Sequence, residues 1–188
     1  MIAGQSRKAA VALGTILITL TVLIILTPYA FGYGTARRTI AVILTDRWFA
    51  SESTTWQYCA LVPLVVGWLV WKRRAMLLDL PIKGALSGVI FMLLGMGSYF
   101  VGYKANNYYF GYVAVQLFIL GAVVWMLGWR WMRTLLFPWI VLGLAWPLYF
   151  LEERLGFPMR MISTQGVMFI ARLLHLPVTS EGTSILSA

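Results

Sequence analysis

Long apolar runs, separated by short polar segments, dominate the chain. The first run extends from Ala10 to Phe31 and would cover about 30 Å as a helix, which is one hydrocarbon thickness of a bilayer. It is longer than the apolar region of a cleaved signal peptide, so we expect a retained transmembrane helix. Four further runs are of the same kind, and the pattern predicts spans near 10–31, 56–71, 84–103, 108–129 and 134–151.

The polar connection after the first span contains a stretch of mixed character. Residues 39–49 include several aliphatic side chains and Trp48. They form either a short helix on the membrane, with Trp48 at the level of the lipid headgroups, or a solvated loop, and the pattern leaves both open. In the third span, four glycines predict a close approach to another helix in lipid: Gly84, Gly88, Gly95 and Gly97.

The segment 158–175 carries too many polar groups for a comfortable span. Arg160 and Arg172 would each cost about 2.5–3.5 kcal/mol at the centre of a bilayer. We therefore predict an amphipathic helix on the outer membrane surface, ending near His175, where the helix dipole favours a cation. The tail, 176–188, is predicted to be an extended strand with a turn at Gly182, open to pairing with a neighbouring protein.

Composition narrows the class of protein. Hydrophobic residues make up 61% of the chain and charged residues 11%, against roughly 45–50% and about 25% in soluble domains. This excludes a soluble globular enzyme and a disordered chain. The predicted fold is all-α: a polytopic helical membrane protein, one integral domain over 1–188, with about five transmembrane helices plus an outer-face amphipathic helix.

The net charge of +9 is carried by short basic clusters between the apolar runs. This placement predicts an orientation on an anionic membrane, with no nucleic acid as a partner. With the N-terminus in the cytoplasm, eight basic residues lie inside: Arg7, Lys8, Lys72, Arg73, Arg74, Lys83, Arg130 and Arg133. Five lie outside before the final segment: Arg37, Arg38, Arg47, Lys104 and Arg154.

Few residues suggest chemistry. The single cysteine, Cys59, has no activating base near it in sequence, so we interpret it as a packing residue. Glu152 and Glu153 could act in acid–base chemistry, but paired carboxylates at the end of a span are more often solvated. We expect no catalytic residue, metal or cofactor. The residues predicted to contact lipid or a partner are Trp48, Trp56, Arg160, Arg172 and His175.

Two stretches carry a specific resemblance. The first is Thr-Trp-Gln-Tyr-Cys-Ala-Leu-Val-Pro at 55–63, leading through an apolar run to the basic residues at 72–74. The second is a series of motifs: Leu136-Phe137-Pro138, Ala145-Trp146-Pro147, Phe157-Pro158, Leu176-Pro177-Val178 and Glu181-Gly182. In their order and spacing these motifs resemble the exosortase/archaeosortase family over most of residues 56–188.

The resemblance implies a membrane transpeptidase of a bacterial inner membrane or archaeal plasma membrane. Such enzymes process C-terminal sorting signals of the PEP-CTERM type on the outer face, with a cysteine in a Cys-Ser-Gly-like motif beyond the Glu-Gly strand. This chain ends at Ala188, before that motif, and Cys59 does not match the nucleophile position. We therefore expect an exosortase-like N-terminal part, not catalytic by itself, with membrane lipids and another membrane protein chain as partners. The alternative is an accessory subunit of a larger membrane complex, for example respiratory or photosynthetic.

Overall fold

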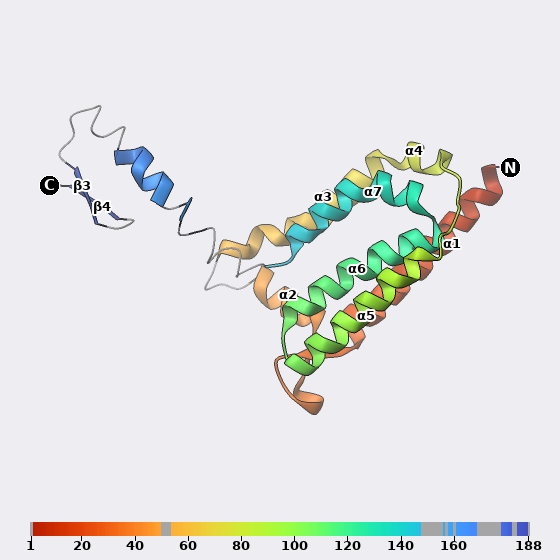
Figure 1. Cartoon of the computed structure of the whole chain (residues 1–188), viewed down its shortest axis with the longest axis horizontal. Helices are drawn as coiled ribbons and strands as arrows, with labels where there is room; N and C mark the ends of the chain where they lie inside the picture. Colours follow the sequence, from red (N-terminus) through yellow and green to blue (C-terminus); the bar gives the residue numbers. More distant parts are fainter. Residues whose placement is uncertain are drawn as a thin grey trace. The chain divides into compact units, whose positions relative to one another are not determined.

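The computed structural model describes residues 2–49, 54–147, 156, 158–159, 161–168, 178–181 and 184–187. The chain forms two compact units, Met1–Pro147 and Leu148–Ala188. The helices of the first unit (Figure 1) are α1 (Ile2–Thr21), α2 (Ile40–Trp48), α3 (Val62–Lys72), α4 (Arg74–Asp79), α5 (Ser87–Ala105), α6 (Tyr108–Met126) and α7 (Trp129–Leu142). A π-helical turn (Val22–Leu26), the 3₁₀ segments Gly34–Ala36, Thr54–Leu61 and Gly143–Ala145, and a two-stranded sheet of β1 (Pro28–Ala30) and β2 (Arg38–Thr39) complete it.

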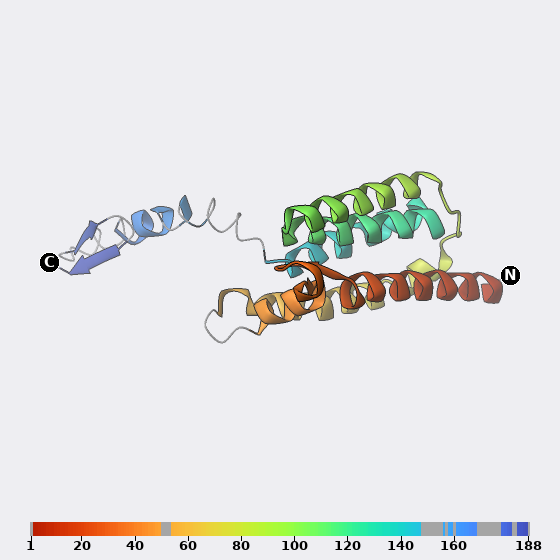
Figure 2. The ribbon, with the colours of Figure 1, turned by 90° about the horizontal axis from the view of Figure 1, so that it is seen from below.

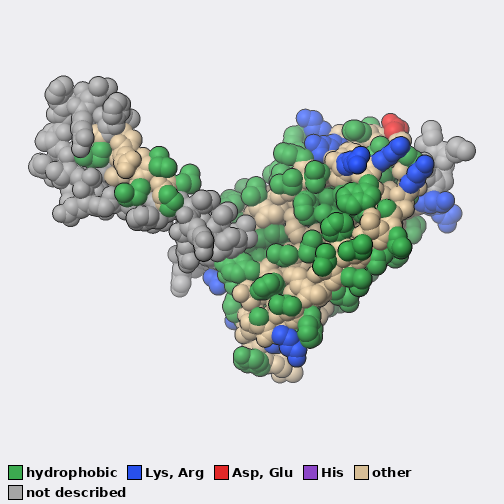
Figure 3. Space-filling model, viewed as in Figure 1, with side chains coloured by type: hydrophobic (Ala, Val, Ile, Leu, Met, Phe, Trp, Pro, Cys, Tyr) green, Lys and Arg blue, Asp and Glu red, His purple; other side chains and the backbone are tan. Residues whose placement is uncertain are grey.

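Three helical segments are long and apolar enough to cross a membrane. They are Arg7–Leu26, Ser87–Ala105 and Tyr108–Met126, which agree with three of the predicted spans. Their outward side chains are apolar and exposed, as at Leu17 (66% exposed) and Leu93 (63%). Figure 3 shows hydrophobic side chains across the middle of one face of the first unit, with Lys and Arg side chains at two opposite ends. The chain is an integral membrane protein with a mostly helical fold.

Among the described residues, the other two predicted spans, 56–71 and 134–151, are not seen as helices long enough to cross a membrane. The apolar helix at 56–71 runs from Gln57 to Lys72 and is shorter than a span. It starts as a 3₁₀ segment and becomes α3 where Pro63 occupies the first turn, a position that tolerates proline. Helix α7 begins before residue 134, because Gly128, with φ of 97°, turns the chain directly out of α6. The end of the predicted span 134–151 lies outside the described residues.

Helices α5 and α6 form the closest pair (Figures 1 and 2). They meet at Gly88 and Gly121, where a Cβ on Gly121 would lie 2.6 Å from the Gly88 carbonyl oxygen. A Cβ on Gly95 would lie 3.0 Å from the Ala114 carbonyl oxygen. Gly84 also lies against the backbone of α6, so three of the four predicted glycines make the close approach that lipid-embedded helices favour. Gly97 does not make this approach: a Cβ on Gly97 would meet no atom of another element within 4 Å, so the prediction for this glycine was wrong.

Backbone and side-chain hydrogen bonds hold the segment before α5 and helix α7 to α6. The extended segment before α5 bonds to the end of α6, with Lys83 N–H donating to the Leu127 carbonyl at 3.3 Å. Gln116 donates to the Trp139 carbonyl at 2.8 Å, and the Trp139 indole donates to the Gln116 carbonyl at 3.0 Å. Polar pairs of this kind join helices in lipid, where an unsatisfied group is costly. Helix α6 is thus the centre of the first unit.

The stretch 39–49 contains the helix α2, as the first of its two predicted alternatives requires, and is not a loop. Its position on the membrane stays a prediction. Thr39 caps α2, its hydroxyl accepting from Val42 N–H at 3.3 Å. Ile40, Ile43 and Leu44 are buried within the first unit.

The second unit contains a helical stretch and a hairpin. Residues 156, 158–159 and 161–168 are helical, which covers part of the predicted 158–175 helix. In the tail, β3 (Val178–Glu181) pairs antiparallel with β4 (Ser184–Ser187). The predicted unpaired strand was therefore wrong: the chain folds back on itself, and the sequence places Gly182 between the two strands.

A substitution at Gly88 tests the α5–α6 contact. Gly88→Ala should lower the free energy of unfolding by about 1–3 kcal/mol, because the new methyl group meets backbone on α6. Gly97→Ala is the matched control on the same helix and should leave it unchanged or raise it by up to about 1 kcal/mol, through helix propensity. Reversible unfolding in mixed micelles, followed by circular dichroism, measures both. Equal effects of the two substitutions would contradict the packing described.

Candidate functional site

The end of the first unit that holds the α5–α6 turn carries a folded polar region, residues 28–49 and 103–107, called here the polar cap. It begins where Pro28 stops the first helix, since proline cannot continue the hydrogen-bond ladder. β1 then pairs with β2, and α2 follows directly. This arrangement places the loop after the first span against the turn between α5 and α6.

Tyr29 is the buried anchor of the polar cap. Its side chain is fully buried, and a Cβ on Gly111 would lie 2.6 Å from its ring. A Cβ on Gly102 would come even closer to the phenol oxygen, so two glycines make the space for the ring. The Tyr29 hydroxyl donates to the Asn107 carbonyl at 3.2 Å. Tyr29 lies beyond the span that ends at Leu26, and burial raises the pKa of its phenol, which therefore stays protonated as a donor.

Arg37 joins the two parts of the polar cap. Its guanidinium donates to the carbonyl of Tyr29 and, at 2.8 Å, to the carbonyl of Tyr103. The same group lies 3.9 Å from the centre of the Tyr103 ring. The Phe31 N–H donates to the Asn106 side-chain oxygen at 2.6 Å, and Asn106 itself has φ of 53°, a conformation that asparagine tolerates. One cation and one amide thus fix the loop to the turn.

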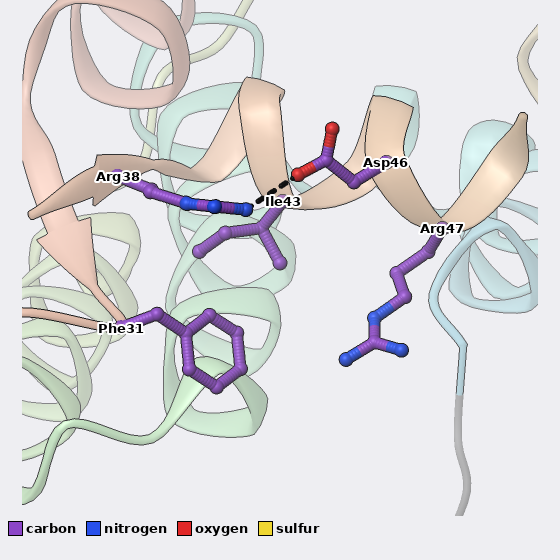
Figure 4. A pocket seen from close by; sticks show the side chains of 5 residues that line it. All are labelled: Phe31, Arg38, Ile43, Asp46 and Arg47. Atoms are coloured by element: carbon purple, nitrogen blue, oxygen red, sulfur yellow. Dashed lines mark hydrogen bonds and ion pairs between the residues drawn. The ribbon is translucent and has the colours of Figure 1, made fainter. Parts of the chain in front are cut away.

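A pocket of about 200 Å³ opens in the polar cap (Figure 4). It is lined by Phe31, Arg38, Ile43, Asp46 and Arg47. Arg38 and Asp46 form an ion pair across it at 2.7 Å, with both side chains more than half exposed. In Figure 4, Phe31 and Arg47 extend to the same side of α2.

The lining determines what this pocket can do. Two guanidinium groups and one carboxylate favour a carboxylate or a peptide carbonyl, and Phe31 with Ile43 provides an apolar wall. None of the five lining residues is a serine, cysteine or histidine. Among the described residues, no group of three or more His, Cys, Asp or Glu lies close enough to hold a metal ion.

The structure places only some of the predicted site residues. The Trp48 indole donates to the Ala145 carbonyl at 3.1 Å, which ties α2 to the segment after α7. Trp56 lies in the 3₁₀ segment Thr54–Leu61. Cys59 is fully buried, as expected of a packing residue. The following lie outside the described residues: Glu152, Glu153, Arg160, Arg172 and His175.

Sequence reasoning missed the residues that build the polar cap. Tyr29 lies near the end of a predicted span, Arg37 entered only the orientation count, and Asn106 lies between two predicted spans. A local signal existed, since Pro28 ends a helix immediately before Tyr29, and Arg37 follows a Gly-rich turn. The partners, however, lie far away in sequence, and no local pattern identifies them.

The comparisons with known proteins give one family. The family model described as transmembrane exosortase (EpsH) matches residues 48–187. The search of curated proteins and the search of solved structures returned no match. The matched range includes α3 to α7 and the hairpin of the second unit, whereas the five residues that line the pocket precede it.

Separate substitutions of two neighbouring arginines test whether Arg37 holds the polar cap together. Arg37→Gln removes charge-assisted hydrogen bonds to two carbonyls, so amide hydrogen exchange across residues 28–39 should accelerate about tenfold or more. Arg38→Gln breaks only an exposed ion pair and should change exchange by less than about threefold. Mass-spectrometric hydrogen exchange on the purified protein measures both. Similar acceleration in the two variants would contradict the role given to Arg37.

Proposed function

The chain belongs to the transmembrane exosortase family, and we propose that it takes part in processing C-terminal sorting signals at a prokaryotic plasma membrane. The observation that carries the proposal is the family match, which covers residues 48–187. The three span-capable helices are consistent with it, because such a substrate is processed at the membrane. Within this activity, the described residues form a scaffold and a peptide-binding surface.

The proposed topology has five spans and a cytoplasmic N-terminus. The second span is the segment containing α3, and the fifth span is the segment that begins with α7. They are supported by their mutual packing and by the bond from the Arg73 guanidinium to the Thr134 carbonyl at 2.8 Å. The larger set of basic residues then faces the cytoplasm, as the positive-inside rule requires. The polar cap and the amphipathic helix 158–175 then belong to the outer face.

In this orientation the polar cap meets a sorting signal as it leaves the bilayer. Arg38 and Arg47 offer donors for a carboxylate or carbonyl of an extended peptide, and Tyr29 and Arg37 hold this surface rigid. Cys59 has no catalytic part, since its side chain is fully buried. We assign the nucleophile to a group other than Cys59, supplied by this polypeptide or by a partner membrane protein.

Processing of a reporter tests the proposed function. A secreted reporter that ends in a sorting signal of the host should keep its C-terminus in cells lacking this protein and lose it when the protein is restored. Cys59→Ser and Cys59→Ala should both restore processing to within about twofold, because the thiol that they remove is buried and serves packing. Alanine is included because a hydroxyl at a fully buried position adds a polar group. The size of the reporter on a gel, normalised to the amount of the membrane protein, is the readout.

Two results would overturn parts of this proposal. Unchanged reporter processing in cells without the protein would reject the function. A hundredfold loss of processing in both Cys59 variants, at normal protein levels, would make Cys59 the nucleophile.

Cysteine labelling tests the topology separately. In a Cys59→Ser background, Lys104→Cys should react with a membrane-impermeant maleimide in intact cells. Arg133→Cys should react only after the membrane is permeabilised. Both native side chains are exposed, so access to the reagent depends on the side of the membrane. The opposite pattern would reverse the orientation.

A further inference from the structure

The end of the first unit opposite the polar cap contains a groove of about 470 Å³. Arg7 and Lys8, near the start of α1, lie at its basic rim. Its walls come from α1, from the segment before α5 and from the end of α6. The apolar lining is Val11, Ala12, Ile82, Trp125 and Met126.

We propose that this groove binds an anionic phospholipid. The headgroup phosphate would lie between the Arg7 and Lys8 side chains, and an acyl chain would follow Val11 and Trp125 towards the bilayer interior. The groove joins the two chemistries that such a lipid presents, a cationic rim and an apolar wall. A soluble anion would use only the cationic rim.

The position of the groove supports a lipid as the occupant. The first candidate span begins at Arg7, so the basic rim lies at the depth of lipid headgroups. Val11 (62% exposed) and Trp125 (46%) are the open part of the apolar wall. Basic pockets between membrane helices are the usual sites for anionic headgroups, and tryptophan favours the membrane interface.

Charge around the groove favours an anion. Within the part of the chain that the structure describes, neither Arg7 nor Lys8 forms an ion pair. Further basic residues occupy the same end of the first unit, at the junctions of α3 with α4 and of α6 with α7 and in the segment before α5: Lys72, Arg73, Arg74, Arg130, Arg133 and Lys83. Arg73 is already used, donating to the Thr134 carbonyl. The positive charge of this end attracts an anionic leaflet, and the groove combines two cations with an apolar channel.

A bound lipid would also strengthen the attachment of α1. Helix α1 contacts α6 through a narrow stripe that includes Ala9, Ala12 and Ile16. A phospholipid in the groove would touch α1, Ile82 and Trp125 together. Because a ligand that binds only the folded state stabilises it, the lipid should raise the resistance of the protein to unfolding.

Native mass spectrometry of the full chain in nonionic detergent tests the proposal. Dioleoyl phosphatidylglycerol is titrated against dioleoyl phosphatidylcholine. The protein should retain one phosphatidylglycerol in preference to phosphatidylcholine. The double variant Arg7→Gln/Lys8→Gln should bind it about thirtyfold more weakly, since each basic side chain near an anionic lipid contributes about a factor of five.

Two further variants distinguish binding in the groove from a general attraction to the positive charge at this end. Lys72→Gln/Arg74→Gln removes the same charge from exposed positions at the same end and should change the affinity by less than about threefold. Val11→Trp keeps both cations but fills the apolar wall, and it should lower the affinity about tenfold or more. Val11 is exposed, so this variant tests the groove even if the double variant fails to fold.

Three results would overturn the proposal. Equal loss of affinity in the two double variants would show that the lipid is attracted by the overall positive charge of this end and not bound in the groove. Equal retention of the two lipids would remove the headgroup specificity. Full displacement of phosphatidylglycerol by inorganic phosphate would show a phosphate site without a role for the acyl chain.

Discussion

The close approach of α5 and α6 is the constraint on which the rest of the structure depends. In lipid, helices gain little from burying apolar surface, so they associate through tight packing and polar contacts. Gly88 and Gly121 bring the two backbones together, and Gly102 and Gly111 continue the contact at the turn. There the missing side chains leave the space that Tyr29 fills. Glycines of the same two helices therefore pack the membrane part and create the base of the polar cap.

Helix α1 links the two functional surfaces through this pair. At one end its span begins at Arg7, on the rim of the basic groove. At the other end the chain leaves the membrane and is fixed by Tyr29 and Arg37 to the α5–α6 turn. Family membership supports the proposed role in sorting-signal processing, and the polar cap and the basic groove are the two surfaces that we propose serve it. In these proposals, the polar cap offers hydrogen-bond donors to a peptide, and the basic groove binds an anionic phospholipid.

The sequence predicted what periodicity and composition control. Apolar runs located three spans, and the glycines at 84, 88 and 95 marked the helix contact. The bounds 56–71 agree with the helix Gln57–Lys72 to within one residue, but this helix is shorter than a span and starts as a 3₁₀ segment before Pro63. The start predicted at 134 was late, because the turn at Gly128 depends on backbone geometry. The polar cap was not predictable, since Arg37 bonds to Tyr103 across a long sequence separation. The pocket follows from that fold and was missed with it.

The central claim is that α5 lies in lipid on one side and against α6 on the other. Nitroxide scanning of α5 in nanodiscs, read by collisions with oxygen and with a water-soluble nickel complex, measures this directly. The account predicts high oxygen accessibility at the exposed positions Leu93 and Met96, and low accessibility at Met92, which packs towards α6. It also predicts that the oxygen signal rises towards the middle of the helix while the nickel signal falls. Equal accessibility at Met92 and Leu93, or strong nickel collisions at mid-helix, would contradict the account.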